Sequence, residues 1–326
     1  MERSRASEYL LVAGAKLQEA HLYIRVSRDR IMTRVTPASN LLEESASRVG
    51  HRHVKVIGPP SFSLLSLVRG LSTLRGYGDL LYTLSLHRVK VRYKQSLLGL
   101  AWAIVQHISL MLIYNLVFSI IVKMPSSGVP YAVFAFVALL PWSYFSTALT
   151  NATNGLVSNA SLVTKVYFPR EILPLSYVTA ALLDLLIASI IMAVLMVYYH
   201  IRITTYIFYA VPIIFVLTAF LTGISFFFSA TQVRFRDIGM AMPLLLQLWM
   251  FATPVVYPLD RVPEWIRGVY ILNPMVGVIE NFRRVVLLGT APDLYLLGVS
   301  AAISLILLPI SYLYFKRVEA TVADLI

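Results

Sequence analysis

The fold class of this chain is decided by one uncharged stretch, LLGLAWAIVQHISLMLIYNLVFSIIV, which occupies residues 97–122. A helix rises about 1.5 Å per residue, so these 26 residues exceed the ~30 Å hydrocarbon core of a bilayer, and tilt can absorb the excess. Backbone groups in lipid must be bonded within the segment or around a closed barrel, whose strands are about half as long and alternate in polarity. The stretch therefore predicts a transmembrane helix.

Five more apolar stretches follow along the chain, and the composition agrees with a membrane protein. Hydrophobic residues make up 58% of the 326 residues and charged residues only 13%, with a mean hydropathy of +0.73. A soluble domain has about a quarter charged residues. These figures exclude a water-soluble enzyme, a disordered protein and a nucleic-acid-binding module. We predict an all-α integral membrane protein with six transmembrane helices, the later five at 129–151, 172–199, 205–231, 238–258 and 294–315.

The net charge of +12 comes from 28 Lys and Arg against 16 Asp and Glu. Such an excess alone suggests a nucleic-acid partner, but in a membrane protein it marks the cytoplasmic loops. The first two outer loops contain, as basic residues, only Lys123 and Arg202. We therefore predict that both termini are cytoplasmic. The basic residues on the predicted inner side are Arg88, Lys90, Arg92, Lys94, Lys165, Arg170, Arg234, Arg236, Lys316 and Arg317.

Residues 1–76 are more polar and more basic than the rest of the chain. Their apolar runs are shorter than the core of a signal peptide, which argues against a cleaved export signal. We expect a poorly ordered cytoplasmic extension, or one added by an upstream start codon, and a partner-binding arm is the alternative. The chain has no cysteine, so a disulfide framework and a thiolate metal site are excluded.

The segment just before the first predicted span has two faces when it is drawn as a helix. Asp79, Thr83, Lys90 and Lys94 lie opposite an apolar stripe, which indicates an interfacial helix with its axis along the membrane surface. The apolar stripe consists of Tyr77, Leu80, Leu81, Leu84 and Val91.

Arg88 falls within this apolar stripe, where its guanidinium must either snorkel or meet an anion. Lipid phosphate is one candidate anion, and the pyrophosphate of a lipid-linked substrate is the other. The basic residues that face such an anion at the membrane surface are Arg88, Lys90, Arg92 and Lys94.

Two further features concern the membrane-embedded part. The last outer loop, 259–293, contains the apolar stretches Gly268–Leu272 and Val285–Leu288. We expect short re-entrant helices there, because a structureless loop of this length is unusual.

Asp184 is the only acidic residue deep in a span, and no Lys or Arg accompanies it in that stretch. An acidic residue at mid-span costs about 2.5–3.5 kcal/mol, so it should face the bundle or water, as a structural hydrogen-bonding group rather than a proton relay.

Motifs of enzymes and nucleotide sites are missing from the sequence. There is no G-x-x-x-x-G-K-[ST], H-E-x-x-H or G-x-S-x-G motif, and the dipeptide Gly-Lys does not occur. We predict no catalytic residue, no metal and no cofactor bound by this chain. If the protein uses ATP, a partner must hydrolyse it.

Aromatic residues can form an interfacial belt, or can line a channel and stack on sugar rings. The channel-lining candidates are Trp102, Tyr114, Phe118, Trp249 and Phe251.

From Tyr77 to the C-terminus the chain resembles the membrane-spanning permease subunit of type-2 ABC exporters of bacterial surface polysaccharides, such as O-antigen, capsule and teichoic acid. The resemblance rests on five pieces in the family's order. They are VKVRYKQSLLGLAWAIVQ (89–106), LLPWSYFSTALTNATNGLVSNASLVTKVYFPREILPLS (139–176), VRFRDI (233–238), TPVVYP (253–258) and NPMVGVIENFRR (273–284).

The resemblance implies a homodimer that pairs with two copies of a separate ABC ATPase, which binds the ATP and Mg. Closure of the ATPase dimer then opens a channel for a glycan carried on a polyprenyl-pyrophosphate lipid across the bacterial cytoplasmic (inner) membrane. Contact with the ATPase falls to a cytoplasmic coupling helix, Ser158–Glu171, which Pro169 ends, and to a smaller contact at Gln232–Asp237. The residues implied are Leu162, Val163, Lys165, Val166, Phe168, Pro169, Arg170, Glu171, Arg234, Arg236 and Asp237.

Three alternatives remain open from the sequence. A drug or small-lipid exporter permease shares the six-span plan. A membrane-embedded polyprenyl-lipid glycosyltransferase would need clustered carboxylates or histidines at a membrane face, whereas the outer-loop acids are scattered among arginines. A proton-coupled secondary transporter would need more than Asp184 and an internal repeat. The outer-loop acids are Asp260, Glu264, Glu280 and Asp293.

Overall fold

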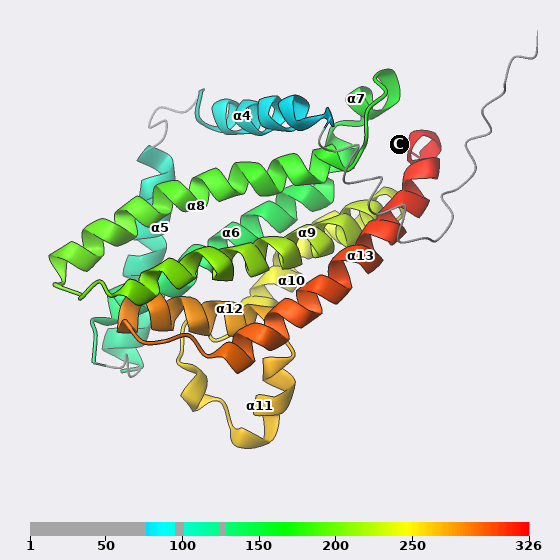
Figure 1. Cartoon of the computed structure of the whole chain (residues 1–326). Coiled ribbons are helices and arrows are strands. Elements are labelled where there is room, and N and C mark those ends of the chain that lie inside the picture. Colours follow the sequence, from blue (N-terminus) through cyan, green and yellow to red (C-terminus); the bar gives the residue numbers. More distant parts are fainter. Residues whose placement is uncertain (1–75, 95–100, 124–127, 326) are drawn as a thin grey trace, which may run out of the picture. The chain divides into compact units, whose positions relative to one another are not determined.

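The computed structural model describes residues 76–94, 101–123 and 128–325 (Figure 1). These residues belong to one compact unit and form helices joined by loops, with no strand among them. The predicted arm, 1–76, and the start of the first predicted span lie outside the described residues, except for Gly76. In chain order the main helices are α4 (Gly78–Lys94), α5 (Ala101–Tyr114), α6 (Tyr131–Ser158), α7 (Ala160–Lys165), α8 (Ile172–Tyr198), α9 (Ala210–Arg234), α10 (Asp237–Phe251), α11 (Glu264–Ile271), α12 (Pro274–Arg283) and α13 (Leu294–Leu325). Shorter pieces are the π-helical turns η1 (Asn115–Ile121) and η4 (Arg284–Leu288) and the 3-10 turns η2 (Thr205–Tyr209) and η3 (Leu259–Arg261).

Four helices in the described part are long and apolar enough to cross a membrane. They coincide with the second, third, fourth and sixth predicted spans. The first and fifth predicted spans form shorter apolar helices, Ile108–Ile121 and Asp237–Phe251. The four long helices are Tyr131–Ser158, Ile172–Tyr198, Thr205–Arg234 and Leu294–Glu319.

The fifth predicted span ends earlier than its apolar letters suggested. Helix α10 stops at Phe251, whereas the prediction continued to Pro258. Pro254 follows Thr253, and a residue before proline is driven out of the helical region. The carbonyl of Ala252 is then satisfied by the side chain of Asn273, at 3.3 Å, instead of by a next turn of helix. The segment 252–258 therefore leads the chain from α10 to η3 and α11.

Helix α6 is the centre of the bundle, since it packs against α5, α8, α9, α10 and α12 (Figure 1). Its first half, residues 131–142, is buried on all sides, which is the pattern of a fully surrounded helix. Phe134, Phe136 and Phe145 are completely buried on it. Gly155 lets α8 approach closely, because a Cβ at that position would lie 2.8 Å from the ring of Tyr177. The central helix α6 leads directly into the loop before α7.

The buried apolar residues form two clusters. The larger cluster lies among α6, α8, α9, α10 and α12. The smaller one, which we call the inner cluster, joins the end of α6, the segment after α7, the start of α8, and the C-terminal halves of α9 and α13. Its buried members are Leu156, Val163, Phe168, Ile172, Leu173, Phe226, Ala230, Val233, Tyr312, Phe315, Val318 and Val322.

Helix α4 has most of the predicted pattern of polar and apolar residues, and its apolar face packs against the chain itself. Its predicted polar face, at Asp79, Thr83, Lys90 and Lys94, is exposed. Val91 does not join the apolar face, since it is 57% exposed. The rest of the apolar stripe packs on the inner cluster of the chain itself, so the helix is docked on protein along this face. These packed residues are Tyr77, Leu80, Leu81 and Leu84.

The last predicted outer loop folds as short helices, as expected. Helix α11 starts at Glu264, and α12 follows it with Asn273 as N-cap, whose side chain accepts a hydrogen bond from the Met275 N–H at 3.1 Å. Nearly all of α12 is buried, against α13, α6 and α9. This makes α12 a part of the core and not a surface loop.

Candidate functional site

The loop between α6 and α8 is the first part of the candidate site. Ser158 Oγ and Asn159 Nδ2 bond back to the Asn154 and Gly155 carbonyls, at 2.8 and 2.7 Å, and end α6. Helix α7 then runs from Ala160 to Lys165. We refer to Ala160–Glu171 as the coupling segment.

The helical part of the coupling segment is shorter than predicted. The chain is already extended at Val166, with φ −125° and ψ 131°, so α7 ends four residues before Pro169. Proline restricts the preceding Phe168 to extended conformations, and the β-branched Val166 favours them. The prediction that Pro169 terminates a helix spanning 158–171 was therefore wrong. The shortening changes which side chains face outwards: Val166 and Tyr167 are exposed, whereas Phe168 is buried.

One face of the coupling segment is buried against the chain itself. Val163 and Phe168 belong to the inner cluster, and Leu162 packs at its edge. Glu171 is 1% exposed. A partner protein cannot touch Phe168 or Glu171 in this conformation.

An ionic network fixes the buried end of the coupling segment to α13. Lys316 Nζ lies 2.7 Å from Glu171 Oε2 and 2.7 Å from Glu319 Oε2. The backbone N–H of Arg170 donates to Glu319 Oε1 at 3.1 Å, and its guanidinium donates to the Glu319 carbonyl. Burial raises the pKa of the Glu171 carboxyl, the nearby Glu319 raises it further, and Lys316 opposes both.

The opposite face of the coupling segment is exposed. Lys165 is solvent-accessible, Val166 is 51% exposed, and Tyr167 is 92% exposed. Large exposed aromatic side chains are enriched among the residues that dominate binding energy at interfaces. Sequence reasoning missed Tyr167, because a helix was assumed through this region. The signal was present in the Val-Tyr-Phe-Pro order, which places Tyr167 opposite Phe168 once the chain is extended.

The turn between α9 and α10 is the second part of the candidate site. Gln232 is buried and holds this turn: its Nε2 donates to the Arg236 carbonyl at 3.2 Å, and its Oε1 accepts from the Gly239 N–H at 2.6 Å. The same Nε2 lies 3.3 Å from Asn154 Oδ1, at the end of α6. The turn is thereby fastened to the helix that leads into the coupling segment. Its exposed residues are Arg234, Phe235, Arg236 and Asp237, of which Phe235 is 61% exposed.

Helix α4 provides the third part, and its arginines are engaged by α8. Arg88 Nε donates to Ser176 Oγ at 2.7 Å, and its guanidinium lies 3.3 Å from the ring centroid of Tyr177. Arg92 forms an ion pair with Asp184. The expectation that Asp184 has no basic companion holds only within its own helix. Lys90 and Lys94 remain on the exposed face.

We expect the Arg92–Asp184 pair to dock α4 on α8, so its two partners should respond unequally to substitution. Arg92→Ala removes the positively charged partner of a carboxylate in a membrane helix, at a cost of up to about 3 kcal/mol. In Asp184→Asn the arginine can still reach water along its flexible stem, so this change should cost less. The measurement is the rate of trypsin cleavage within α4 of the purified protein. Trypsin should cleave α4 more slowly in the protein with both substitutions than in the protein with Arg92→Ala alone. Complete loss of transport in Asp184→Asn at normal abundance would instead assign Asp184 a direct role.

Two of the predicted channel aromatics, Tyr114 and Phe118, lie close together. Tyr114 and Phe118 pack against the larger cluster with ring centroids 6.1 Å apart, and Tyr114 Oη reaches the Met250 sulfur at 3.5 Å. Phe251 is 51% exposed. The side chain of Trp102 lies outside the described residues.

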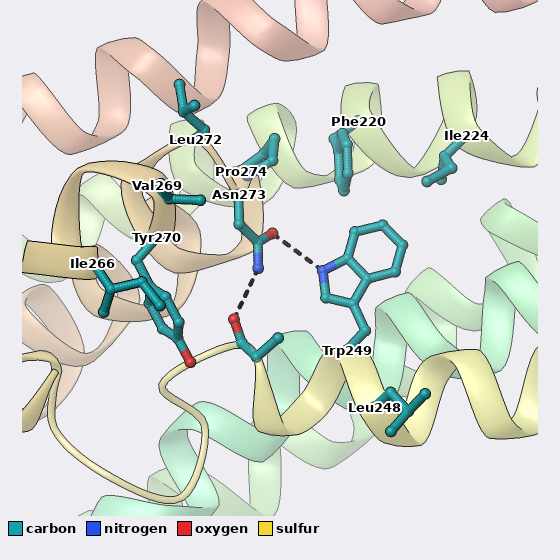
Figure 2. A pocket seen from close by; sticks show the side chains of 11 residues that line it. Phe220, Ile224, Leu248, Trp249, Ile266, Val269, Tyr270, Leu272, Asn273 and Pro274 are labelled. Atoms are coloured by element: carbon teal, nitrogen blue, oxygen red, sulfur yellow. Dashed lines mark hydrogen bonds between the residues drawn. The ribbon is translucent and has the colours of Figure 1, made fainter.

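Trp249 lines a pocket of about 690 Å³ between α9, α10, α11 and the start of α12 (Figure 2). Its indole Nε1 donates to Asn273 Oδ1 at 3.2 Å, and Asn273 Nδ2 donates to Thr253 Oγ1 at 2.9 Å. Phe145 and Phe220 meet its ring edge-on. The pocket wall is almost entirely apolar, and Trp249 is held rigidly within it.

The chemistry of these parts is that of a docking surface. Within the described ranges, no group of three or more His, Asp or Glu is arranged to hold a metal ion. Exposed aromatic and basic groups sit beside a buried ionic network at the ends of several long apolar helices. Such an arrangement can receive a partner and pass movement to the helices.

Comparison with known proteins agrees with this geometry. Residues 79–287 match the family model described as ABC-2 type transporter. The O-antigen export system permease protein RfbA of Myxococcus xanthus is 33% identical over 247 residues, which cover 75% of this chain and 93% of the relative. RfbA of Klebsiella pneumoniae is 29% identical over 248 residues, covering 76% and 90%. The polysialic acid transport protein KpsM of Escherichia coli is 25% identical over 246 residues, covering 73% and 93%.

The match spans α4 to η4 and includes the coupling segment, the α9–α10 turn and the Trp249 pocket. Together with four spanning-length apolar helices, it explains why the sequence lacks a nucleotide-binding motif of its own. The chain belongs to the ABC-2 type transporter family, as a multi-pass membrane subunit that works with an ABC ATPase and is not itself an enzyme.

Proposed function

We propose that the chain is the permease subunit of an ATP-driven exporter that moves a polysaccharide on a polyprenyl-pyrophosphate lipid across the bacterial inner membrane. The observation that carries this proposal is the match over most of the chain to proteins named for O-antigen export and polysialic acid transport. The glycan is then O-antigen-like, capsular or a teichoic acid. A drug or small-lipid exporter permease is the alternative within the same family.

The proposed assembly contains two copies of this chain and two copies of the ATPase, which bind the ATP and Mg. Six spans with both termini in the cytoplasm place the coupling segment and the α9–α10 turn on the ATPase side. In this topology α5 and α10 are the two shorter spans, and residues 1–76 are a cytoplasmic extension. Basic residues support this orientation, because they gather at the helix ends near the coupling segment, and cytoplasmic loops are rich in Lys and Arg. These residues are Lys165, Arg234, Arg236, Lys316 and Arg317.

The ATPase is proposed to contact the exposed part of the candidate site. Tyr167 and Phe235 supply apolar contact area, and Lys165, Arg234 and Arg236 supply charge that orients the partner. The buried residues of the coupling segment act from within the chain. Val163 and Phe168 seat the segment on the inner cluster, while Arg170 and Glu171 join it to α13.

Fewer residues than the sequence suggested are proposed for anion binding and for the channel wall. The exposed Lys90 and Lys94 are the candidates for contact with lipid phosphate or pyrophosphate, because Arg88 and Arg92 are bonded to α8. Tyr114, Phe118, Trp249 and Phe251 are the described candidates for the channel wall.

The proposed function is tested by deleting the gene for this chain in its own cell. We expect the surface polysaccharide to disappear while lipid-linked glycan accumulates on the cytoplasmic side. Re-expression of the chain should restore the surface glycan only when the ATPase is present. Normal surface glycan together with altered drug sensitivity would favour the alternative. Sugar transfer by the purified chain without any partner would show a glycosyltransferase.

A further inference from the structure

Helix α13 is joined to the coupling segment without a covalent link. Helices α6 and α8 continue directly into that segment, whereas α13 reaches it through the Glu171–Lys316 ion pair, the bonds from Arg170 to Glu319, and shared burial in the inner cluster. Phe315 and Val318 lie in the same cluster as Phe168. The two elements therefore meet over both an ionic and an apolar contact.

A buried ion pair at this place needs an explanation other than stability. Removing charges from water costs nearly as much as their attraction returns, so an apolar contact of the same shape would hold the helix as well. What an ion pair adds is a fixed register. Here the lysine is shared between Glu171 and Glu319, and Tyr312 Oη lies 3.4 Å from Glu171 Oε1. These contacts fix where α13 stands relative to the coupling segment.

Helix α13 is one continuous element of 32 residues, about 48 Å long at 1.5 Å per residue. It packs along α9, and the two backbones approach so closely that a Cβ on Gly223 would lie 3.0 Å from the Leu308 Cα. Pro309 lies inside α13 beside this contact and removes one backbone hydrogen bond of the helix. The close contact with α9 supports the helix at this point, and close-packed interiors transmit strain.

The other end of α13 carries the outer helix α12. Ser300 Oγ donates to the Pro274 carbonyl at 3.0 Å, and the Asp293 N–H donates to Asn281 Oδ1 at 2.5 Å. At Gly277 there is no room even for a methyl group, since a Cβ would lie 2.2 Å from Ser300 Oγ and 2.4 Å from the Leu296 carbonyl oxygen. Helix α12 is seated directly on α13.

We propose that α13 carries the movement of the coupling segment to α12, with Glu171 and Lys316 as the positioning residues of its inner joint. This inference rests on the proposed function, because it assumes that an ATPase moves the coupling segment. It assigns the outer helices of the last loop to the part of the molecule that responds to ATP. A single substitution of Lys316 removes its ion pairs with both Glu171 and Glu319, while the chain between α6 and α8 stays intact.

The experiment uses the full chain assembled with its ATPase in lipid nanodiscs. The chain has no cysteine, so Leu272→Cys introduces a single thiol at an exposed position next to α12. Its labelling rate with a polar maleimide is compared between the nucleotide-free and the ATP–vanadate-trapped complex. We expect the rate to differ about fivefold or more between the two states. An identical rate in both states would overturn the proposal.

The joint is then altered in this background. Lys316→Met should abolish the nucleotide-dependent difference while the ATPase still binds and hydrolyses ATP. Lys316→Arg should keep the difference. The swap Glu171→Lys with Lys316→Glu retains one lysine and two glutamates in the cluster and should restore it, which separates a positioning role from a folding defect. The control is Arg202→Met, which also removes one exposed positive charge but lies away from the joint; it should leave the labelling difference unchanged.

The outcomes separate the inference from the proposed function. A full labelling difference in Lys316→Met overturns the assignment of the joint. So does a swap variant that assembles with the ATPase but shows no difference. If Lys316→Met fails to accumulate, the Lys316→Arg and swap variants decide the question. Failure of the unaltered complex to export lipid-linked glycan would contradict the proposed function, while a labelling difference in that complex would leave α13 as the carrier of movement for another cargo.

Discussion

Replacement of Tyr167 by alanine is expected to abolish most export without affecting the fold. The side chain is 92% exposed and lies opposite the buried Phe168, so its removal leaves no cavity in the chain. A central aromatic residue at an interface commonly contributes 2 kcal/mol or more, which corresponds to about a 30-fold loss of affinity. We therefore expect the ATPase to bind about 30-fold more weakly and surface glycan to fall correspondingly. The measurements are the dissociation constant of the permease–ATPase complex and the surface glycan of the cells.

The matched control for this prediction is Tyr295→Ala. Tyr295 is 70% exposed at the start of α13, on the side of the bundle away from the coupling segment. The Tyr295→Ala variant should bind the ATPase with unchanged affinity. A second comparison is Phe168→Ala, which leaves a cavity in the inner cluster. The cavity should lower the free energy of unfolding by roughly 3–5 kcal/mol, and the abundance of the protein should fall as a result. Normal ATPase affinity in Tyr167→Ala would remove Tyr167 from the docking surface.

The contrast between Tyr167 and Phe168 shows where sequence reasoning ends. Long apolar runs predicted α6, α8, α9 and α13 well, because backbone groups in lipid leave little choice of structure. The segment 158–171 is short, and its conformation depends on Val166 and on the proline after Phe168. The helical prediction gave Tyr167 no role, whereas in the structure the chain leaves the helix at Val166, Tyr167 is exposed and Phe168 is buried.

Long-range pairs were beyond the sequence for a different reason. Asp184 was recognised as unusual in an apolar setting, but nothing in its spacing from Arg92 shows that α4 docks along α8. The same applies to Glu171 and Lys316, which occupy separate predicted elements. Trp249 was identified as aromatic and membrane-embedded, and only the structure shows its indole bonded to Asn273. Periodicity gives the face of a helix, not the element that covers it.

Arg283 shows the same limit, and its replacement by alanine is expected to have the largest effect on stability. The side chain is 1% exposed on α12. Its Nη2 donates to the Pro254 and Val255 carbonyls at 3.0 and 3.2 Å, its Nη1 lies 3.1 Å from Glu280 Oε2, and its guanidinium lies 4.0 Å from the ring centroid of Phe134. It is thus the clamp that holds the segment after α10 against α12 and α6.

Removing one partner of a buried ion pair costs about 3–5 kcal/mol, because the other charge stays behind without compensation. Arg283→Ala also strands two carbonyls, so abundance in the membrane should fall severely, as measured by quantitative immunoblotting and by thermal unfolding of the purified protein. Arg284→Ala is the matched control, since Arg284 makes an exposed bond to the Ala291 carbonyl and should be tolerated. If the unpaired Glu280 causes the loss, then Arg283→Met combined with Glu280→Gln should be more stable than Arg283→Met alone. Equal stability of those two variants would show that the lost carbonyl bonds, and not the stranded charge, dominate.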